Sequence, residues 1–324
     1  MIKKKNRVTE LFGIEYPVLS ASMSWVTSAE LVAAVSNAGG LGILGANAGQ
    51  TELTSDPVET AERMRAEIRK TRTLTDKPFG ATLMVFGQAG PFDEPLFNMY
   101  LEEDVPVIFC LNDVPKEWID KFHAAGKKCI HKDIFATRES FAKAEQMGYD
   151  AVIVAGVDCG GHSNKRTIGT FTAIRMATES TSQPVIAAGG IVDGVTVKCA
   201  SLLGAEGVYV GTRFLASKEC TIAEVSKQKM IETTTDDLVQ VEGFFGPILS
   251  VATPPIMEAK KLMDDGIPKH ALEISKAYRG GYRTGMLLGD IQNGILDVSS
   301  AIDMIKDIKS VQEIMDDFVS GMED

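Results

Sequence analysis

Short apolar segments alternate with longer amphipathic segments over the first two thirds of the chain. The apolar segments are almost continuous runs of Val, Ile, Leu and Ala, which is typical of strands that are covered on both faces. Eight such segments predict strands at Pro17–Ser20, Leu41–Leu44, Phe79–Met84, Val105–Cys110, Lys128–His131, Ala151–Ala155, Val185–Ala188 and Gly207–Val210. Helical patterns lie between them at Ser28–Ala38, Pro57–Lys70, Asp93–Glu103, Lys116–Ala125, Arg138–Met147, Thr170–Glu179 and Gly194–Leu203.

This strand–helix alternation predicts an α/β fold, a (β/α)8 TIM barrel. A doubly wound open sheet is the alternative. Eight parallel strands weigh against it, as does the absence of a G-x-G-x-x-G fingerprint after the first strand.

The alternation stops after the eighth strand. Residues 217–285 have a helix-like pattern, and we expect them to form an inserted helical substrate or lid subdomain over the barrel mouth. The barrel itself would then comprise residues 1–216 and 286–324. The helix that closes the barrel is expected near Val298–Ile308, and the amphipathic stretch Val311–Val319 is expected to pack on the outside.

Composition narrows the class of protein. The net charge of −11 and the pI near 5.0 argue against a nucleic-acid partner or an anionic membrane surface. Five cysteines without a C-x-x-C pair fit a reducing, cytoplasmic compartment. No signal-type apolar core and no run of about 18 apolar residues is visible, so we expect no membrane span. No ligand pair has metal-site spacing, so no metal is expected.

Glycine turns follow the seventh and eighth strands, where barrels of this kind commonly hold phosphate. Gly189 and Gly190 end one strand, and Gly211 and Thr212 end the next. Their backbone N–H groups, the Thr212 hydroxyl and the positive ends of the following helices could all meet one anion. The alternative is that both are tight turns that pack strand on helix.

Of the four histidines, His162 has the sequence context that is most typical of a catalytic residue. The sixth strand leads through Gly160 and Gly161 to His162. The glycines leave room for a flat ligand, and imidazole suits proton transfer near neutral pH. The alternative is a loop histidine with a structural role. At the end of the first strand, Ala21 and Ser22 are small enough to leave room for a planar ring, although small residues also fill a tapering barrel.

Other polar candidates lie at the ends of strands 4 to 6. Cys110, Cys129 and Cys159 could converge on a ligand, although buried cysteine is usually only a small hydrophobe. His131 and Lys132 end the fifth strand and are expected to face the cavity, where Lys132 could balance an anionic cofactor or a substrate carboxylate.

Several segments together resemble the nitronate monooxygenase family, formerly the 2-nitropropane dioxygenases. That family includes the FMN-dependent enoyl-acyl-carrier-protein reductase. The resemblance covers about residues 7–217, with weaker similarity around 285–310. It depends on Met23, 38-AGGLGILG-45, 160-GGH-162, 187-AAGGI-191 and 204-GAEGVYVGTRF-214.

The resemblance implies a non-covalent FMN over the barrel mouth, with His162 as the catalytic residue that faces the substrate. The phosphate would meet the two glycine turns, the ring would lie against the end of the first strand, and Thr82 would lie near the polar edge of the ring. The implied cofactor-binding residues are Ala21, Ser22, Met23, Thr82, Lys132, Gly160, Gly161, Gly189, Gly190, Gly211 and Thr212.

This chain departs from the family pattern around the ring and the histidine. It has Ala21-Ser22 where Gly-Gly is usual and Thr82 where asparagine is frequent. Asp158, Cys159 and Asn164 near His162 also differ, which leaves the substrate open.

Two redox functions fit these residues. The first is oxidation of alkyl nitronates with O2 to carbonyl compounds and nitrite. The alternative is NAD(P)H-dependent reduction of an enoyl thioester, such as an enoyl-acyl-carrier-protein, or of an enone. A second alternative is a flavin- or phosphate-binding barrel without redox chemistry. We expect a small-molecule substrate, and a homodimer remains open.

Overall fold

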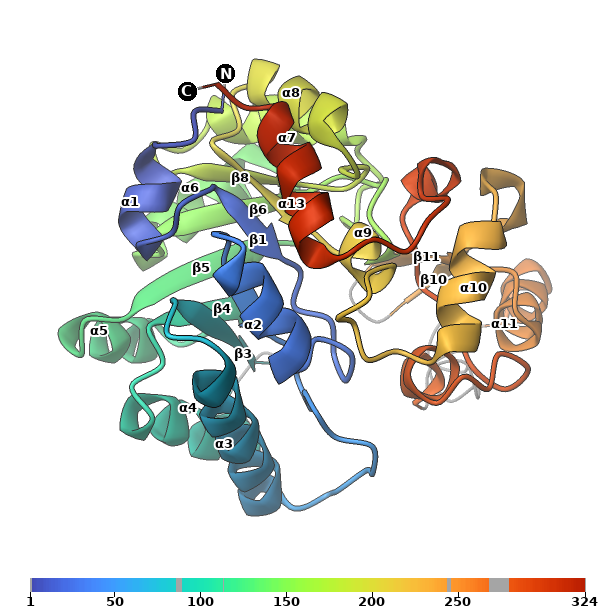
Figure 1. Cartoon of the computed structure of the whole chain (residues 1–324), viewed down its shortest axis with the longest axis horizontal. Coiled ribbons are helices and arrows are strands. Elements are labelled where there is room, and N and C mark those ends of the chain that lie inside the picture. Colours follow the sequence, from blue (N-terminus) through green and yellow to red (C-terminus); the bar gives the residue numbers. More distant parts are fainter. Residues whose placement is uncertain (1, 86–88, 113, 244–245, 268–279, 324) are drawn as a thin grey trace.

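Eight parallel strands form the centre of the molecule. The computed structural model describes residues 2–85, 89–112, 114–243, 246–267 and 280–323. The strand order is β1-β9-β8-β6-β5-β4-β3-β2, and a bridge between Leu19 and Leu41 brings the first strand beside the last to close the barrel (Figure 1). The predicted (β/α)8 TIM barrel is confirmed. The strands are β1 (Val18–Ser20), β2 (Gly42–Leu44), β3 (Phe79–Met84), β4 (Val107–Leu111), β5 (Lys128–Asp133), β6 (Ala151–Ala155), β8 (Val185–Ala188) and β9 (Gly207–Val210).

Side chains alternate between the inside of the barrel and its helix-covered outside, as a strand requires. On β4, Phe109 packs in the barrel interior, where its ring stacks on that of Tyr209 with centroids 5.5 Å apart. The neighbouring Ile108 and Cys110 pack outside, beneath the helices. Both faces are apolar, which explains why the sequence shows runs rather than alternation.

Helices cover the outside of the strands (Figure 1). Local sequence starts them: Pro57 opens one helix, and the Asp56 side chain accepts hydrogen bonds from the backbone N–H groups of Val58 and Glu59. No helix within the described ranges is long and apolar enough to cross a bilayer. The helices that precede β9 are α1 (Arg7–Phe12), α2 (Ala29–Asn37), α3 (Pro57–Leu74), α4 (Asp93–Glu102), α5 (Lys116–Ala124), α6 (Arg138–Met147), α7 (Thr170–Thr178) and α8 (Gly194–Leu202).

The last helix of the barrel is α13 (Val311–Ser320), which packs against both α2 and α8. Its buried face contains Val311, Ile314, Met315 and Phe318. The prediction that a helix near Val298–Ile308 closes the barrel was wrong, because that stretch contains only the short 3-10 helix η3 (Ser300–Met304). The amphipathic pattern of Val311–Val319 therefore marked the closing helix itself.

The segment after β9 contains helices, as expected, but it also contains a β-hairpin. After the short helix α9 (Thr212–Leu215), the chain forms α10 (Glu224–Glu232), η1 (Thr235–Asp237), β10 (Leu238–Glu242), β11 (Pro247–Val251) and α11 (Pro254–Asp264). Residues 268–279 of the predicted insertion lie outside the described residues. A π-helical turn, η2 (Arg283–Leu287), leads back to the barrel. Figure 1 shows this segment, in yellow to orange, at one side of the barrel.

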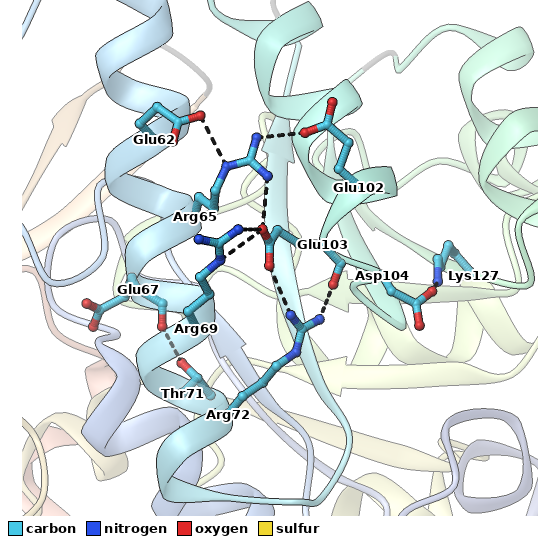
Figure 2. Close-up of polar contacts among 10 residues, drawn as sticks. All are labelled: Glu62, Arg65, Glu67, Arg69, Thr71, Arg72, Glu102, Glu103, Asp104 and Lys127. Carbon is cyan, nitrogen blue, oxygen red and sulfur yellow. Dashed lines mark hydrogen bonds and ion pairs between the residues drawn. The ribbon is translucent and has the colours of Figure 1, made fainter.

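A buried carboxylate fastens α3 to α4. The Glu103 side chain is 8% exposed and receives ion pairs from Arg65 at 2.9 Å, Arg69 at 2.7 Å and Arg72 at 3.1 Å (Figure 2). Burial alone would raise the pKa of Glu103, but the hydrogen bonds from Arg69 and Arg65 outweigh it and leave the pKa below its usual value. Ionised Glu103 therefore stabilises the fold at neutral pH.

We expect Glu103→Gln to lower the free energy of unfolding by about 1–3 kcal/mol at neutral pH, because three arginines lose the charged acceptor that they share. The control is Glu102→Gln, since Glu102 is 62% exposed and pairs with Arg65 alone. The pKa of Glu103 is lowered by folding, so the difference between wild type and Glu103→Gln should shrink as the pH falls through and below the usual glutamate range. Urea unfolding of both variants measures this, and equal midpoints for the two would contradict it.

Candidate active site

One cavity of about 400 Å³ opens where the strands end at the C-terminal side of the barrel. Its walls come from the loops after β1, β5, β6, β8 and β9 and, on the far side, from residues 280–299 and β11. The structure brings most of the predicted site residues to this one place. Those that line it are Ala21, Ser22, Met23, Lys132, Gly160, Gly161, His162, Gly189, Gly190, Gly211 and Thr212.

Thr82 is the predicted residue that does not line the cavity. It is buried beneath Ser22, and its hydroxyl contacts both the Ser22 hydroxyl and, at 2.7 Å, the carbonyl of Leu44. The Thr82 hydrogen goes to that carbonyl, since a carbonyl can only accept. Ser22 must then donate its own hydrogen to Thr82, which leaves Ser22 as an acceptor toward the cavity. Thr82 thus acts through Ser22.

Tyr209 forms part of the cavity floor and was missed in the sequence. Its hydroxyl accepts a 2.7 Å hydrogen bond from the backbone N–H of Ser22. Burial raises the pKa of Tyr209 well above its usual value, so the floor stays neutral. The sequence signal that could have identified Tyr209 was its position in the strand Gly207–Val210, where its side chain points into the barrel.

His162 lies on a two-residue strand rather than a free loop. This strand, β7 (Gly161–His162), pairs antiparallel with β11, with Gly161 opposite Leu249 and His162 opposite Ile248. The next N–H, of Ser163, donates to the carbonyl of Pro247 at 3.0 Å. The hairpin after β9 therefore fixes the backbone of His162, and the side chain of His162 lines the cavity.

Two polar neighbours of His162 have structural roles. The Asp158 carboxylate accepts from the Thr170 hydroxyl at 2.5 Å and the Thr170 N–H at 3.1 Å, which anchors the start of α7. Asn164 is fully buried and donates to the carbonyls of Ala155 at 3.0 Å and Ile168 at 2.8 Å. Neither side chain lines the cavity, so the departures from the family pattern at these positions hold the loop in shape.

The three cysteines do not all converge, because Cys110 and Cys129 meet each other outside the barrel while Cys159 lies apart from them. Cys159 lines the cavity, and burial raises the pKa of its thiol against the opposing charge of Lys132, so the thiol stays protonated. Cys110 and Cys129 pack outside the barrel among apolar side chains, as small hydrophobes. Within the described ranges, no three His, Cys, Asp or Glu side chains converge to hold a metal ion.

His131 does not face the cavity as predicted. Its ring stacks on that of Tyr149, with centroids 4.7 Å apart, while Lys132 lines the cavity. Adjacent residues of a strand point to opposite faces, so only one of the pair could lie inside.

The two glycine turns both line the cavity but differ in backbone geometry. Gly189 and Gly190 have φ values of +102° and +73°, which favour glycine. A Cβ on Gly211 would lie 3.3 Å from the Ala21 Cβ and 3.4 Å from the Met23 sulfur, so this turn is closely packed. The backbone N–H groups of Gly190 and Gly211 make no hydrogen bond to another described residue.

The helix termini contribute less than expected. At the start of α8, the Asp193 carboxylate accepts from the N–H of Thr196 at 2.8 Å, so this N-terminus has its own cap. The short α9 begins at the cavity and has no side-chain cap. At its first residue, Thr212, the hydroxyl accepts from the N–H of Ser299 at 2.9 Å and keeps its own hydrogen to donate.

The far wall of the cavity was not predicted. It includes Trp25 and Arg283, whose guanidinium carbon lies 5.6 Å from the centre of the Trp25 indole. Arg283 also donates to the carbonyl of Thr51 and so ties the segment after β9 to the loop after β2. The remaining unpredicted wall residues include Ile248, Tyr282, Ile295, Asp297 and Ser299.

Comparison with known proteins agrees with this architecture. Residues 5–321 match the family model described as nitronate monooxygenase. A probable nitronate monooxygenase of Staphylococcus aureus (strain Newman) is 30% identical over 310 residues, 83% of this chain and 84% of the relative. The structure of FabK from Thermotoga maritima is 33% identical with a TM-score of 0.86, covering 98% of this chain and 96% of that one. Nitroalkane oxidase from Streptomyces ansochromogenes shares the fold, with a TM-score of 0.79 at 22% identity and 98% coverage of both chains. This chain belongs to the nitronate monooxygenase family, a family of oxidoreductases.

Proposed function

We propose that the protein is an FMN-dependent nitronate monooxygenase, which oxidises alkyl nitronates with O2 to carbonyl compounds and nitrite. The observation that carries this proposal is that His162 and two glycine turns with available N–H groups line one cavity, in a chain of this family. NAD(P)H is not required by this reaction.

The residues present fit FMN. A cavity of about 400 Å³ is within the usual range for small-molecule sites. The N–H groups of Gly190 and Gly211 and the Thr212 hydroxyl are donors suited to a phosphate. The ring would lie against the end of β1. When bound, FMN would supply the redox chemistry, which is to take electrons from the substrate and pass them to O2. The proposed cofactor set is Ala21, Ser22, Met23, Lys132, Gly160, Gly161, Gly189, Gly190, Gly211 and Thr212, with Thr82 supporting Ser22.

His162 is the proposed proton-transfer residue. As imidazole it takes the α-proton of a neutral nitroalkane, and as imidazolium it holds the nitro oxygens. Pairing with β11 fixes the backbone of His162, so His162 needs little reorientation when the substrate binds. Lys132 places a positive charge on the same cavity, which favours an anionic nitronate.

The second candidate is reduction of an enoyl thioester or an enone with NAD(P)H. It is favoured by the 33% identity with FabK of Thermotoga maritima over almost the whole chain. His162 would then polarise the carbonyl or deliver the proton that completes the reduction. The same residues would hold FMN.

Anaerobic stopped-flow spectroscopy separates the two. We expect purified protein to be yellow, an alkyl nitronate to bleach the flavin, and O2 to restore the colour with release of nitrite. Bleaching by NAD(P)H and recovery with an enoyl thioester would favour the reductase instead. A colourless protein that takes up no flavin on reconstitution would contradict both.

Gly190→Val should lower the amount of bound FMN severalfold, because its branched side chain enters the space proposed for the phosphate. The control is Gly126→Val: Gly126 has a similar φ of +78°, and a Cβ there would meet nothing within 4 Å. Backbone strain is therefore matched in the two variants. Flavin released on denaturation is the measurement, and equal content in both variants would place the phosphate elsewhere.

His162→Ala should keep FMN bound but reduce turnover by roughly 10²–10⁴-fold, the range typical of a general acid or base. His123→Ala is the control, since His123 lies on α5 and pairs with Asp150 at 2.9 Å, outside the cavity lining. Steady-state nitrite release reports the turnover. If His162→Ala turned over like the control, His162 would have no part in the chemistry.

A further inference from the structure

A carboxylic acid lies in the cavity beside the strand that carries His162. Asp297 forms an antiparallel bridge with Ser250 of β11, the strand that also pairs with β7. Because β10 occupies the other edge of β11, Asp297 and β7 lie along the same edge. A Cβ placed on Gly161 would be 3.5 Å from the Asp297 Oδ2. Asp297 and His162 thus line one cavity from neighbouring backbone segments.

Asp297 has little to stabilise a negative charge. Its Oδ1 is buried and has no hydrogen-bond partner among the described residues, and no described cation forms an ion pair with it. Arg283, the nearest arginine in sequence, is directed to the Trp25 ring and to the carbonyl of Thr51. The other titratable or charged groups that line the cavity are Lys132, Cys159, His162, Tyr209 and Tyr282.

The physical consequence is that this carboxyl keeps its proton below about pH 7. Burial raises the pKa of Asp297 to about 7, against a smaller lowering effect of Ser250. Burial also keeps the thiol of Cys159 and the hydroxyl of Tyr282 protonated, so neither adds a charge beside it. A neutral carboxylic acid is a hydrogen-bond donor, and donors in a water-poor site stabilise oxygen atoms that gain negative charge.

We propose that Asp297 is a second catalytic acid of this site, which donates a hydrogen bond to an oxygen of the substrate while His162 acts on the proton at carbon. The inference rests on the proposed function in that the substrate reacts in this cavity. It specifies the substrate class further: a molecule with an oxygen that gains or holds negative charge, as in a nitro, nitronate or conjugated carbonyl group. No bond to Asp297 forms or breaks.

Two substitutions of Asp297 separate its roles. Asp297→Asn keeps the shape and a donor but cannot ionise, whereas Asp297→Leu removes the donor. In wild type, kcat/KM should fall as the pH rises through about 7, because the donor becomes a carboxylate. Asp297→Asn should lose less than about tenfold at pH 6 and lack this decline, and Asp297→Leu should lose roughly 10²-fold throughout. Flavin content should stay the same in all three.

The control variant is Asp290→Asn, which removes a carboxylate of an exposed turn that accepts from Asn293. It should keep the wild-type pH profile. Identical pH profiles for wild type and Asp297→Asn would overturn the proposal. A preference for substrates with an ammonium group, abolished in Asp297→Asn, would also overturn it, because Asp297 would then be ionised and bind a cation.

A readout without turnover keeps this test separate from the proposed function. Infrared difference spectra of wild type should show a protonated carboxyl that ionises near pH 7 and is absent in Asp297→Asn. Folding raises the pKa of Asp297, so this carboxyl loses its proton at a lower pH in the unfolded chain than in the folded one. The stability of wild type should therefore decrease as the pH rises from about 4 to about 7. The Tm of flavin-free Asp297→Asn should therefore gain on wild type by several degrees over that window. If these signals appear but no nitronate or enoyl substrate is turned over, the proposed function fails, and the protonated carboxyl of Asp297 stands without it. If turnover occurs and Asp297 is ionised at pH 6, the proposal for Asp297 fails alone.

Discussion

The antiparallel pairing of β7 with β11 is the contact on which the site depends. A two-residue strand cannot persist alone, and the glycines before His162 would leave its loop loose. The hairpin supplies the missing partner, and the same edge of β11 then receives Asp297. Close approach explains the glycines: a Cβ on Gly160 would lie 2.5 Å from the carbonyl carbon of Val298. The barrel and the segment after β9 therefore build the site together.

Beneath that contact, the floor of the cavity is neutral and internally hydrogen-bonded. Ser22 joins the Thr82 hydroxyl through its side chain and the Tyr209 hydroxyl through its N–H. Buried polar groups that already have partners do not reorganise when a ligand arrives. Charge is therefore confined to the walls of the cavity, where Lys132 lies together with the proposed acid–base groups His162 and Asp297.

The barrel could be predicted from sequence because its signals are local. Apolar runs indicated the strands, and the pairs Gly189-Gly190 and Gly211-Thr212 indicated the turns at the ends of the last two. The predictions from sequence were wrong where contacts between residues distant in sequence determine the local structure. Which of His131 and Lys132 points inward depends on the register of β5, and the hairpin at 238–251 is stabilised partly by β7, far away in sequence. Asp297 follows no motif, and its place in the cavity comes from its bridge to β11, which lies far away in sequence.

The two ends of the barrel have separate tasks. Helices run opposite to the strands they cover, so Glu103, which ends α4, lies at the end away from the cavity, and its cluster stabilises the fold without contact with substrate. At the other end, the barrel loops supply His162 and the glycine turns to the cavity. The opposite wall, with Ile248, Tyr282 and Asp297, comes from the segment after β9. Ile248 belongs to a small cluster apart from the barrel core, whereas Tyr282 also packs against that core. Substitutions at Ile248 therefore change what fits beside His162 with the least effect on barrel packing, so substrate choice within the family can diverge there at little cost in stability.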